Sequence, residues 1–337
     1  MGGDNAPRAV VEGACEAVRE SDVSVMLVGD EDAIKDVLGN ARSAIDRLEI
    51  VHTDQFVGMD EPAITPIRKK RRSSVRLCAD LVHKGQAHGM VTAGNTGAAM
   101  VAAKMVMGMI EGVDRPALSM VVPSPKGRPT LVLDVGANVD SKPRYLRQFA
   151  VMGHSYAEQI LGTKNPSIGL LSIGEEASKG SDLTREVFKI MESGSLNFAG
   201  NVEGGDVFAG TVDVIICDGF VGNVMLKACE SLAELTIHHM REEISKSWLS
   251  KAGYLLARPA FERLRLRMDY SEHGGATLLG VNGGCFIGHG RSNAHAVKNA
   301  VLEAAAFCRT GLHQKMRERI AELHRFEEAL VQSEEVG

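Results

Sequence analysis

The chain has 337 residues, of which 44% are hydrophobic and 4% aromatic, and it carries a formal net charge of -5. It is long enough for a large buried core, whereas the acidic balance and the few aromatic side chains argue against nucleic acid as a partner. No apolar stretch is long enough to span a bilayer. The six cysteines form no C-x-x-C pair, as expected of reduced thiols in the cytoplasm.

The N-terminal third alternates helical and strand patterns. Apolar residues at helical spacing predict helices over Ala9–Glu20, Glu31–Leu38, Ser73–Lys84 and Ala98–Met109. Short apolar runs predict strands over Val23–Val28 and Leu48–Val51 and around Val91. A glycine after the second and third of these helices marks the expected helix ends.

The middle of the chain continues the alternation. Strands are expected over Leu118–Val122 and Leu131–Leu133, joined by a turn rich in proline and glycine, and over Ser167–Ser172, Phe198–Val202 and Val212–Cys217. Helices are expected over Tyr145–Leu161 and Asp182–Glu192. This order predicts a single α/β/α domain over residues 1–337, with a mostly parallel sheet covered by helices on both faces.

Residues 224–273 predict a helical excursion from this domain. Helical patterns cover Val224–Leu249 and Lys251–Met268, the second interrupted by Pro259. The excursion carries apolar candidates for contact with a partner subunit or a membrane, namely Leu255, Leu256 and Phe261. A glycine-rich connector over Gly274–Gly290 and a terminal helical region over Ala294–Leu330 follow.

Five loops rich in glycine and asparagine stand where a helix is expected to begin, four of them directly after an expected strand. They are MGGDN (Met1–Asn5), AGNTG (Ala93–Gly97), DVGANVD (Asp134–Asp140), IGEEASKG (Ile173–Gly180) and CDGFVGN (Cys217–Asn223). Open α/β sheets bind ligands at the carboxyl ends of their parallel strands. The loops are therefore expected to converge at corresponding strand ends and to form one extended site.

The residue types in these loops favour an anion. Backbone N–H groups at helix starts, amide side chains and one lysine together suit phosphate or an oxyanion. The candidate catalytic residues are Lys179 and Asn223, and the candidate substrate-binding residues are Asn5, Gly94, Asn95, Thr96, Asn138 and Gly222. The ordinary alternatives are tight turns, helix caps and a solvated lysine. No nucleotide-binding glycine motif and no metal-ligand spacing occurs, so neither a standard nucleotide site nor a metal site is expected.

Taken together, the motifs resemble the bacterial phosphate acyltransferase family over nearly the whole chain. They are MGGDNAP, VTAGNTGA, DRPAL, DVGANVD-x-KP, QFAVMG, IGEE-x-x-KG, NVEG, CDGFVGN, MDYSEHGGA and HG-x-S. Two departures stand out. Family members carry an apolar strand ahead of MGGDN, and this chain begins inside that motif. Ser141 stands where a cysteine is expected, which argues against a covalent role for its side chain.

The resemblance implies an isocitrate or isopropylmalate dehydrogenase-like fold and a homodimer. It implies the conversion of acyl-[acyl-carrier protein] and inorganic phosphate to acyl phosphate and free carrier protein, without a cofactor, in phospholipid biosynthesis. The acyl phosphate would pass to a downstream glycerol-3-phosphate acyltransferase. The expected location is the cytoplasm, with peripheral membrane contact.

A run of five basic residues adds a candidate docking surface. It comprises Arg68, Lys69, Lys70, Arg71 and Arg72. The run is either a solvated face or a contact for the acidic carrier protein or anionic lipid headgroups.

Two other functions fit the sequence less well. One is a phosphate acetyltransferase-like enzyme that uses acyl-coenzyme A, and the other is a catalytically silent membrane scaffold for lipid synthesis.

Overall fold

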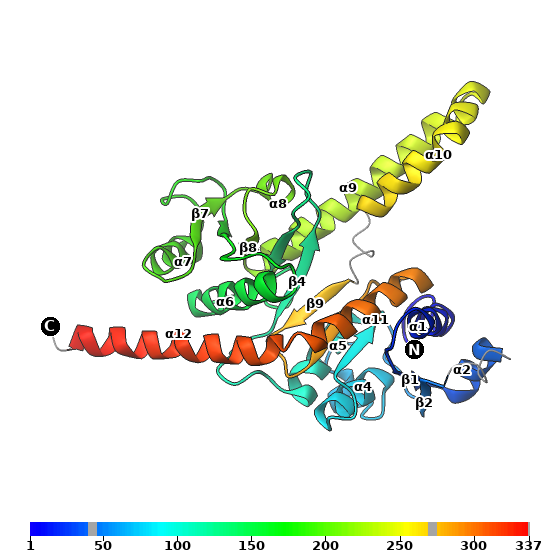
Figure 1. Cartoon of the computed structure of the whole chain (residues 1–337), viewed down its shortest axis with the longest axis horizontal. Coiled ribbons are helices and arrows are strands. Elements are labelled where there is room, and N and C mark those ends of the chain that lie inside the picture. Colours follow the sequence, from blue (N-terminus) through cyan, green and yellow to red (C-terminus); the bar gives the residue numbers. More distant parts are fainter. Residues whose placement is uncertain (40–45, 269–274, 336–337) are drawn as a thin grey trace.

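The computed structural model describes residues 1–39, 46–268 and 275–335, without the side chains of residues 262–268 and 326–335. A central sheet lies between layers of helices, and two long helices project from this body (Figure 1). The N-terminus lies in the body, whereas the C-terminus lies at the far end of another long helix (Figure 1).

The larger sheet is mixed but mostly parallel. Within the described residues its order is β3 (Gly89–Thr92), β10 (Gly284–Ile287), β9 (Ala276–Leu279), β4 (Ala117–Val122), β5 (Thr130–Leu133), β8 (Val214–Ile216), β6 (Ile168–Leu171) and β7 (Phe198–Val202). The antiparallel pairs are β10–β9, β9–β4 and β4–β5, and the others are parallel. The expected α/β architecture is confirmed at this level, and its dehydrogenase-like subtype stays a prediction.

A second, two-stranded sheet stands apart from the first. It pairs β1 (Val25–Gly29) with β2 (Leu48–His52) in parallel. Helices α1 (Arg8–Glu20) and α2 (Glu31–Leu38) pack against it and bury one apolar cluster that includes Val11, Leu27 and Ile34.

The glycine-rich segment expected to be a connector contains two strands of the sheet, β9 and β10, so that expectation is wrong. The glycines there serve close packing and turns: Gly280 and Gly283 have φ of +89° and +119°, and a Cβ on Gly284 would lie 2.9 Å from the Cys308 sulfur. Glycine suits these positions because it has no side chain. Residue 274, where the connector was expected to begin, lies outside the described residues.

Helices cover both faces of the large sheet because its strands alternate apolar residues between two cores. Leu131 and Leu133 of β5 face one core, and Val132 between them faces the other. The first core lies under α6 (Pro143–Gln159), α7 (Asp182–Glu192), α11 (Ala294–Arg309) and α12 (Leu312–Glu335). The second lies under α4 (Ser74–His83), α5 (Thr96–Ala102) and the π-helix η2 (Ala103–Met107). Short helices α3 (Thr65–Arg68) and α8 (Asp206–Ala209) complete the body.

Two helix boundaries differ from the sequence expectation. The helix expected over Ala98–Met109 begins at Thr96 and turns into the π-helix η2 after Ala102. The terminal helical region is divided into α11 and α12 at Gly311, whose φ is +67°. A left-handed residue ends an α-helix, and glycine adopts it without strain.

The expected helical excursion is the pair α9 (Gly219–Ser245) and α10 (Trp248–Met268), which lie side by side and point away from the body (Figure 1). Pro259 lies inside α10, so the expected interruption is wrong. Its position is exposed, and water can bond the carbonyl that proline leaves unpaired. The end of the expected excursion, residues 269–273, lies outside the described residues. No helix in the described part of the chain is long and apolar enough to cross a membrane.

Candidate active site

One row of paired residues crosses the large sheet and shows where its strands end. The row is Val91, Phe286, Thr277, Ser119, Leu133, Ile216, Leu170 and Asn201. Strands β3 and β5 run in opposite directions, yet each ends within one residue of this row. Their following loops therefore leave the row in opposite directions.

The five loops consequently form two groups, and the expectation that they converge at corresponding strand ends is wrong. The first loop group comprises residues 1–5 and 93–97, together with a further segment after β10, residues 288–292. The second comprises residues 134–140, 173–180 and 217–223. Four strand spacings of about 4.8 Å separate β3 from β5, or about 19 Å. Helix α9 links the groups: it begins at Gly219, and its Glu234 lies 3.6 Å from Arg291. Those 15 residues of helix span about 22 Å.

Hydrogen bonds and close backbone contacts hold the segments of the first loop group together. The Asp4 N–H donates to the Gly290 carbonyl at 2.9 Å. The Asn5 amide donates to the carbonyls of Arg291 and Ser292 at 3.0 and 3.3 Å. A side chain on Gly3 would collide with the Ala93 carbonyl, so glycine lets MGGDN touch AGNTG. Asn5 therefore positions a neighbouring loop.

Asn95 is also committed to internal hydrogen bonds. Its Oδ1 caps helix α5 by accepting from the Ala98 N–H at 2.9 Å. Its Nδ2 donates to the carbonyls of Gly58, Met59 and Glu61 at 2.9 to 3.1 Å. The side chain thus holds residues 58–61 against the loop. Of the other two candidates there, Gly94 is buried and Thr96 is exposed.

The second loop group is organised by the fully buried carboxylate of Asp134. Its oxygens accept from the backbone N–H groups of Gly136, Ala137 and Asn138 at 2.8 to 3.1 Å. They also accept from the Leu118 N–H at 3.0 Å and the Asn138 Nδ2 at 2.8 Å. Burial raises the pKa of Asp134, and these hydrogen bonds oppose that rise. The carboxylate therefore sets the shape of the loop that carries Asn138.

Helix α9 begins directly against this loop. A Cβ on Gly219 would lie 2.5 Å from the Asn138 carbonyl, and one on Gly222 would collide with the Asp134 carbonyl. The Gly222 N–H donates to the Asp218 carbonyl at 3.0 Å, so this amide serves the helix. The two glycines let the helix start lie on the loop backbone.

That close contact brings Asn223 beside Gly136. Asn223 is exposed, and a Cβ on Gly136 would lie 3.4 Å from its Oδ1. The structure therefore joins the loop that carries Asn138 to the segment that carries Asn223. Cys217, which follows Asp134 by 83 residues, donates its thiol to the Asp134 carbonyl.

Lys179 lies in the loop of the second group that follows β6. Its side chain is exposed, and its ammonium has no ion pair within the described residues. The loop is held at Glu176, whose carbonyl accepts from the Lys179 N–H and the Asn201 amide, both at 2.9 Å. Strand β6 neighbours β8, the strand that leads to Asn223. Lys179 and Asn223 therefore follow adjacent parallel strands.

Two polar side chains at these strand ends did not emerge as sequence candidates. The Ser172 hydroxyl and the Asn201 Oδ1 are buried without a hydrogen-bond partner in the described part of the molecule. Ser172 lies at the carboxyl end of β6, and Asn201 lies at the carboxyl end of β7. The sequence signal that was available is a polar residue directly after a short apolar run. Across the described residues, no three His, Cys, Asp or Glu side chains are grouped as metal ligands.

Comparison with known proteins shows the family to which this chain belongs. Residues 1–315 match the family model described as fatty acid synthesis protein. The phosphate acyltransferase of Trichlorobacter lovleyi is 50% identical over 323 residues, which are 96% of this chain and 93% of that protein. The phosphate acyltransferase of Aquifex aeolicus is 48% identical over 317 residues, 94% of each chain. The chain belongs to the phosphate acyltransferase family. It is an acyl-transfer enzyme, as the resemblance predicts.

Solved structures of phosphotransacylases share the fold of this family member. A phosphotransacetylase from Streptococcus pyogenes aligns with a TM-score of 0.60 at 17% identity, over 90% of this chain and 91% of that chain. A branched-chain phosphotransacylase from Enterococcus faecalis V583 aligns with a TM-score of 0.52 at 16% identity, over 91% and 96%. At such identities the likeness concerns the fold alone.

We expect Asp134→Asn to loosen the second loop group. The substitution replaces one accepting oxygen by an NH₂ group that faces N–H donors, at a cost of about 1–3 kcal/mol in unfolding free energy. Urea denaturation measures the loss, and hydrogen exchange of residues 135–138 shows where it falls. Asp140→Asn is the matched control, since Asp140 is exposed in the same loop. Equal stability of the two variants would contradict the anchoring role.

Proposed function

We propose that this phosphate acyltransferase converts acyl-[acyl-carrier protein] and inorganic phosphate to acyl phosphate and free carrier protein, in phospholipid biosynthesis. The observation that supports the site is the pair Lys179 and Asn223, both exposed, with Lys179 in the loop after β6 and Asn223 near the start of α9 after the adjacent parallel strand β8. The proposed location is the cytoplasm, with peripheral membrane contact. The product would pass to a glycerol-3-phosphate acyltransferase.

The reaction needs little help from a general acid or a general base. A phosphate oxygen attacks the thioester carbonyl carbon, the C–S bond breaks, and the departing thiolate takes up a proton. If its second pKa resembles the ~6 of a phosphomonoester, phosphate is largely dianionic at neutral pH. The thiol that leaves has a pKa of about 8.5 by analogy with cysteine. The enzyme must therefore position the reactants and neutralise the charge that develops on the carbonyl oxygen.

We assign phosphate to the second loop group. The Lys179 ammonium would neutralise phosphate or the developing oxyanion, and Asn223 would orient the reacting oxygens beside Asn138. The first loop group, with Asn5, adjoins the end of β3, which lies about 19 Å from β5 by the strand spacing. Contact of Asn5, Gly94, Asn95 and Thr96 with the same phosphate is therefore not part of the proposal.

The basic run is proposed as the contact for the acidic carrier protein. Arg68, Lys69, Arg71 and Arg72 are exposed, and complementary charge accelerates encounter. Lys70 is the exception, since its ammonium pairs with Glu61 at 2.5 Å and donates to the Phe56 carbonyl at 2.9 Å. Through Glu61 the run adjoins the loop that Asn95 holds.

The pair α9 and α10 is proposed as the contact for both a second subunit and a membrane. Near the outer end, Leu255 and Leu256 are 68% and 86% exposed. Phe261 is half-buried, with its ring 5.3 Å from that of Tyr254, so it packs within α10. On α9, Leu232 is 64% exposed. We assign the outer leucines to the bilayer interface and the apolar face of α9 to a homodimer contact.

The decisive experiment compares thiol carriers. With phosphate present, we expect acyl phosphate to form from acyl-[acyl-carrier protein] with a much higher kcat/KM than from the same acyl-coenzyme A. The competing function, supported by the fold shared with phosphotransacetylases, predicts the reverse order. Formation from neither thioester would contradict the proposed reaction. Raising the salt concentration should increase KM for the carrier protein, because screening weakens the basic contact.

Lys179→Ala should lower kcat by about 10²–10³-fold, the range for loss of one group that stabilises an oxyanion. Steady-state kinetics with varied phosphate would measure it. Lys164→Ala serves as control, because Lys164 is an exposed lysine on a different loop. If both variants turn over like the parent, the lysine assignment is wrong.

Membrane contact can be separated from dimerisation with Leu255→Glu/Leu256→Glu. This double variant should lose flotation with anionic liposomes, since two charges would have to enter the apolar interface. Sedimentation velocity checks that it still dimerises. Phe208→Glu, at an exposed apolar position on α8, is expected to float normally. Undiminished flotation of the double variant would exclude insertion at these leucines.

A further inference from the structure

An exposed apolar side chain accompanies each of the two asparagines of the second loop group. Val139 directly follows Asn138 and is 65% exposed. Phe220 is 59% exposed and precedes Asn223 by three residues in α9. Residues three apart in a helix are neighbours on its surface, so Phe220 and Asn223 share one face of α9. Polar and apolar groups therefore meet solvent side by side at both positions.

The lysine of this loop group has the same kind of neighbour. Ile173 lies in the loop after β6 and is 81% exposed. A Cβ on Gly174 would lie 3.1 Å from the Lys179 Cγ, so the lysine stem lies over the residue that follows Ile173. Strands β5, β8 and β6 are adjacent and parallel. Val139, Phe220 and Ile173 therefore follow three neighbouring strand ends, and together they are called the apolar rim.

The chemistry of acyl transfer gives the apolar rim a reason to be exposed. Large apolar groups that gather at one place on a surface mark a contact site. The substrate of an acyl-transfer enzyme has an alkyl chain joined directly to the carbonyl carbon that reacts. A site that binds this carbonyl must therefore offer apolar contact within the length of a few carbon–carbon bonds.

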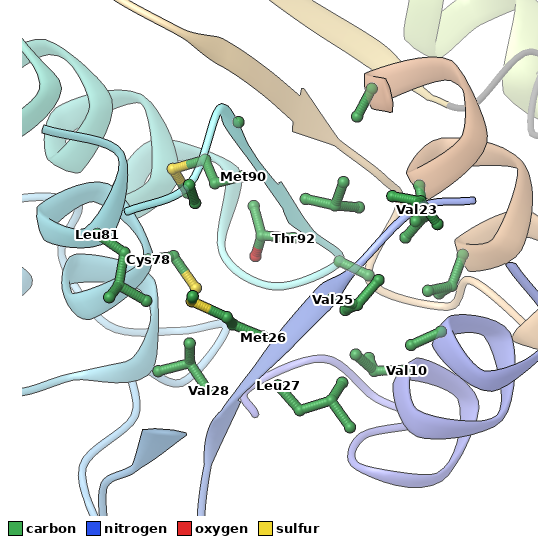
Figure 2. A pocket seen from close by; sticks show the side chains of 18 of the residues that line it. Val10, Val23, Val25, Met26, Leu27, Val28, Cys78, Leu81, Met90 and Thr92 are labelled. Atoms are coloured by element: carbon green, nitrogen blue, oxygen red, sulfur yellow. The ribbon is translucent and has the colours of Figure 1, made fainter. Parts of the chain in front are cut away.

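The other large apolar space in the described part of the molecule lies too far from the second loop group for those first carbons. It is a cavity of about 740 Å³ between β1 and β3, with Val25, Met26 and Met90 among its lining residues (Figure 2). Strand β3 is four strand spacings from β5, or about 19 Å. Carbons next to a carbonyl at Lys179 therefore cannot lie in this cavity.

We propose that the apolar rim binds the first carbons of the substrate's acyl chain. Ile173 and Phe220 would then determine how tightly substituents close to the reacting carbonyl are held. The proposal rests on the proposed function, because it takes that carbonyl to lie between Lys179 and Asn223. A second copy of this chain suits the rim less well. A protein face laid over the rim would also cover the exposed Lys179 ammonium, and removing an unpaired charge from water is costly.

The test measures the affinity of unreactive analogues of the acyl phosphate product. In β-ketophosphonates a methylene group replaces the bridging oxygen of the acyl phosphate, so no acyl transfer can occur. Isothermal titration calorimetry compares analogues whose alkyl groups run from methyl to hexyl. For the parent chain, affinity should rise by up to about fourfold per methylene group, the value for complete burial. In Ile173→Ser/Phe220→Ser the rise should fall below about twofold per methylene group. Affinity for the methyl analogue should change little, because Lys179 and Asn223 remain.

Phe208→Ser is the matched control, since Phe208 is 44% exposed on α8, outside the apolar rim. It should keep the parent chain's dependence of affinity on alkyl length. Ile173 and Phe220 are exposed, so their replacement removes little buried area. If the double variant does not fold, each single variant is measured in its place and should show part of the effect.

Two results would overturn the proposal. Equal dependence on alkyl length in the parent chain and the rim variants would mean that the rim does not contact the acyl chain. If such variants also sediment as a smaller species, the rim is a subunit contact. An affinity that does not rise with alkyl length in the parent chain, or no binding of any analogue, would equally exclude the assignment. Failure of the proposed reaction is a separate result, because it would appear as a lack of acyl phosphate formed from thioesters, whatever the affinity of the analogues.

Discussion

The buried carboxylate of Asp134 is the interaction on which the candidate site depends. It gathers N–H donors from its own loop and from the start of β4, and so converts a flexible glycine sequence into one defined backbone path. A charged group without water is stable only when such partners surround it. Once the loop is set, its carbonyls form the surface on which α9 begins, and Gly219 and Gly222 allow that contact. The location of Asn223 follows from this chain of contacts.

Helix α9 gives the molecule its second constraint, because it fixes the distance between the two loop groups. Its first turn belongs to the second group, and Glu234 further along reaches Arg291 of the first. A helix is stiff along its axis and rises about 1.5 Å per residue. The same helix continues outward beside α10 and carries exposed apolar side chains. A partner or surface that contacts the outer part is thereby connected to both loop groups through one rigid element.

Part of the site was predictable because each loop has a local cause. A glycine or asparagine after a short apolar run predicts a strand end followed by a helix start, and Asn95 and Asp218 do cap helices. What could not be predicted is how these strand ends are arranged. Strands β9 and β10 were hidden by glycines that serve close packing. Strand β9 runs antiparallel to both β10 and β4, and β5, which is antiparallel to β4, therefore runs opposite to β3. With both strands missed, loops that leave in opposite directions looked like neighbours.

The sequence by itself determined the alternation of helices and strands, the mostly parallel sheet, and membership of the phosphate acyltransferase family, since periodicity and motifs are properties of neighbouring residues. The tertiary structure decided which polar side chains remain available. The amide groups of Asn95 and Asn5 are used in hydrogen bonds that hold loops together. Lys179 and Asn223 are exposed and follow adjacent strands. The physical reason is that a hydrogen-bonding side chain is committed by partners distant in sequence, and only the folded chain brings those partners within reach.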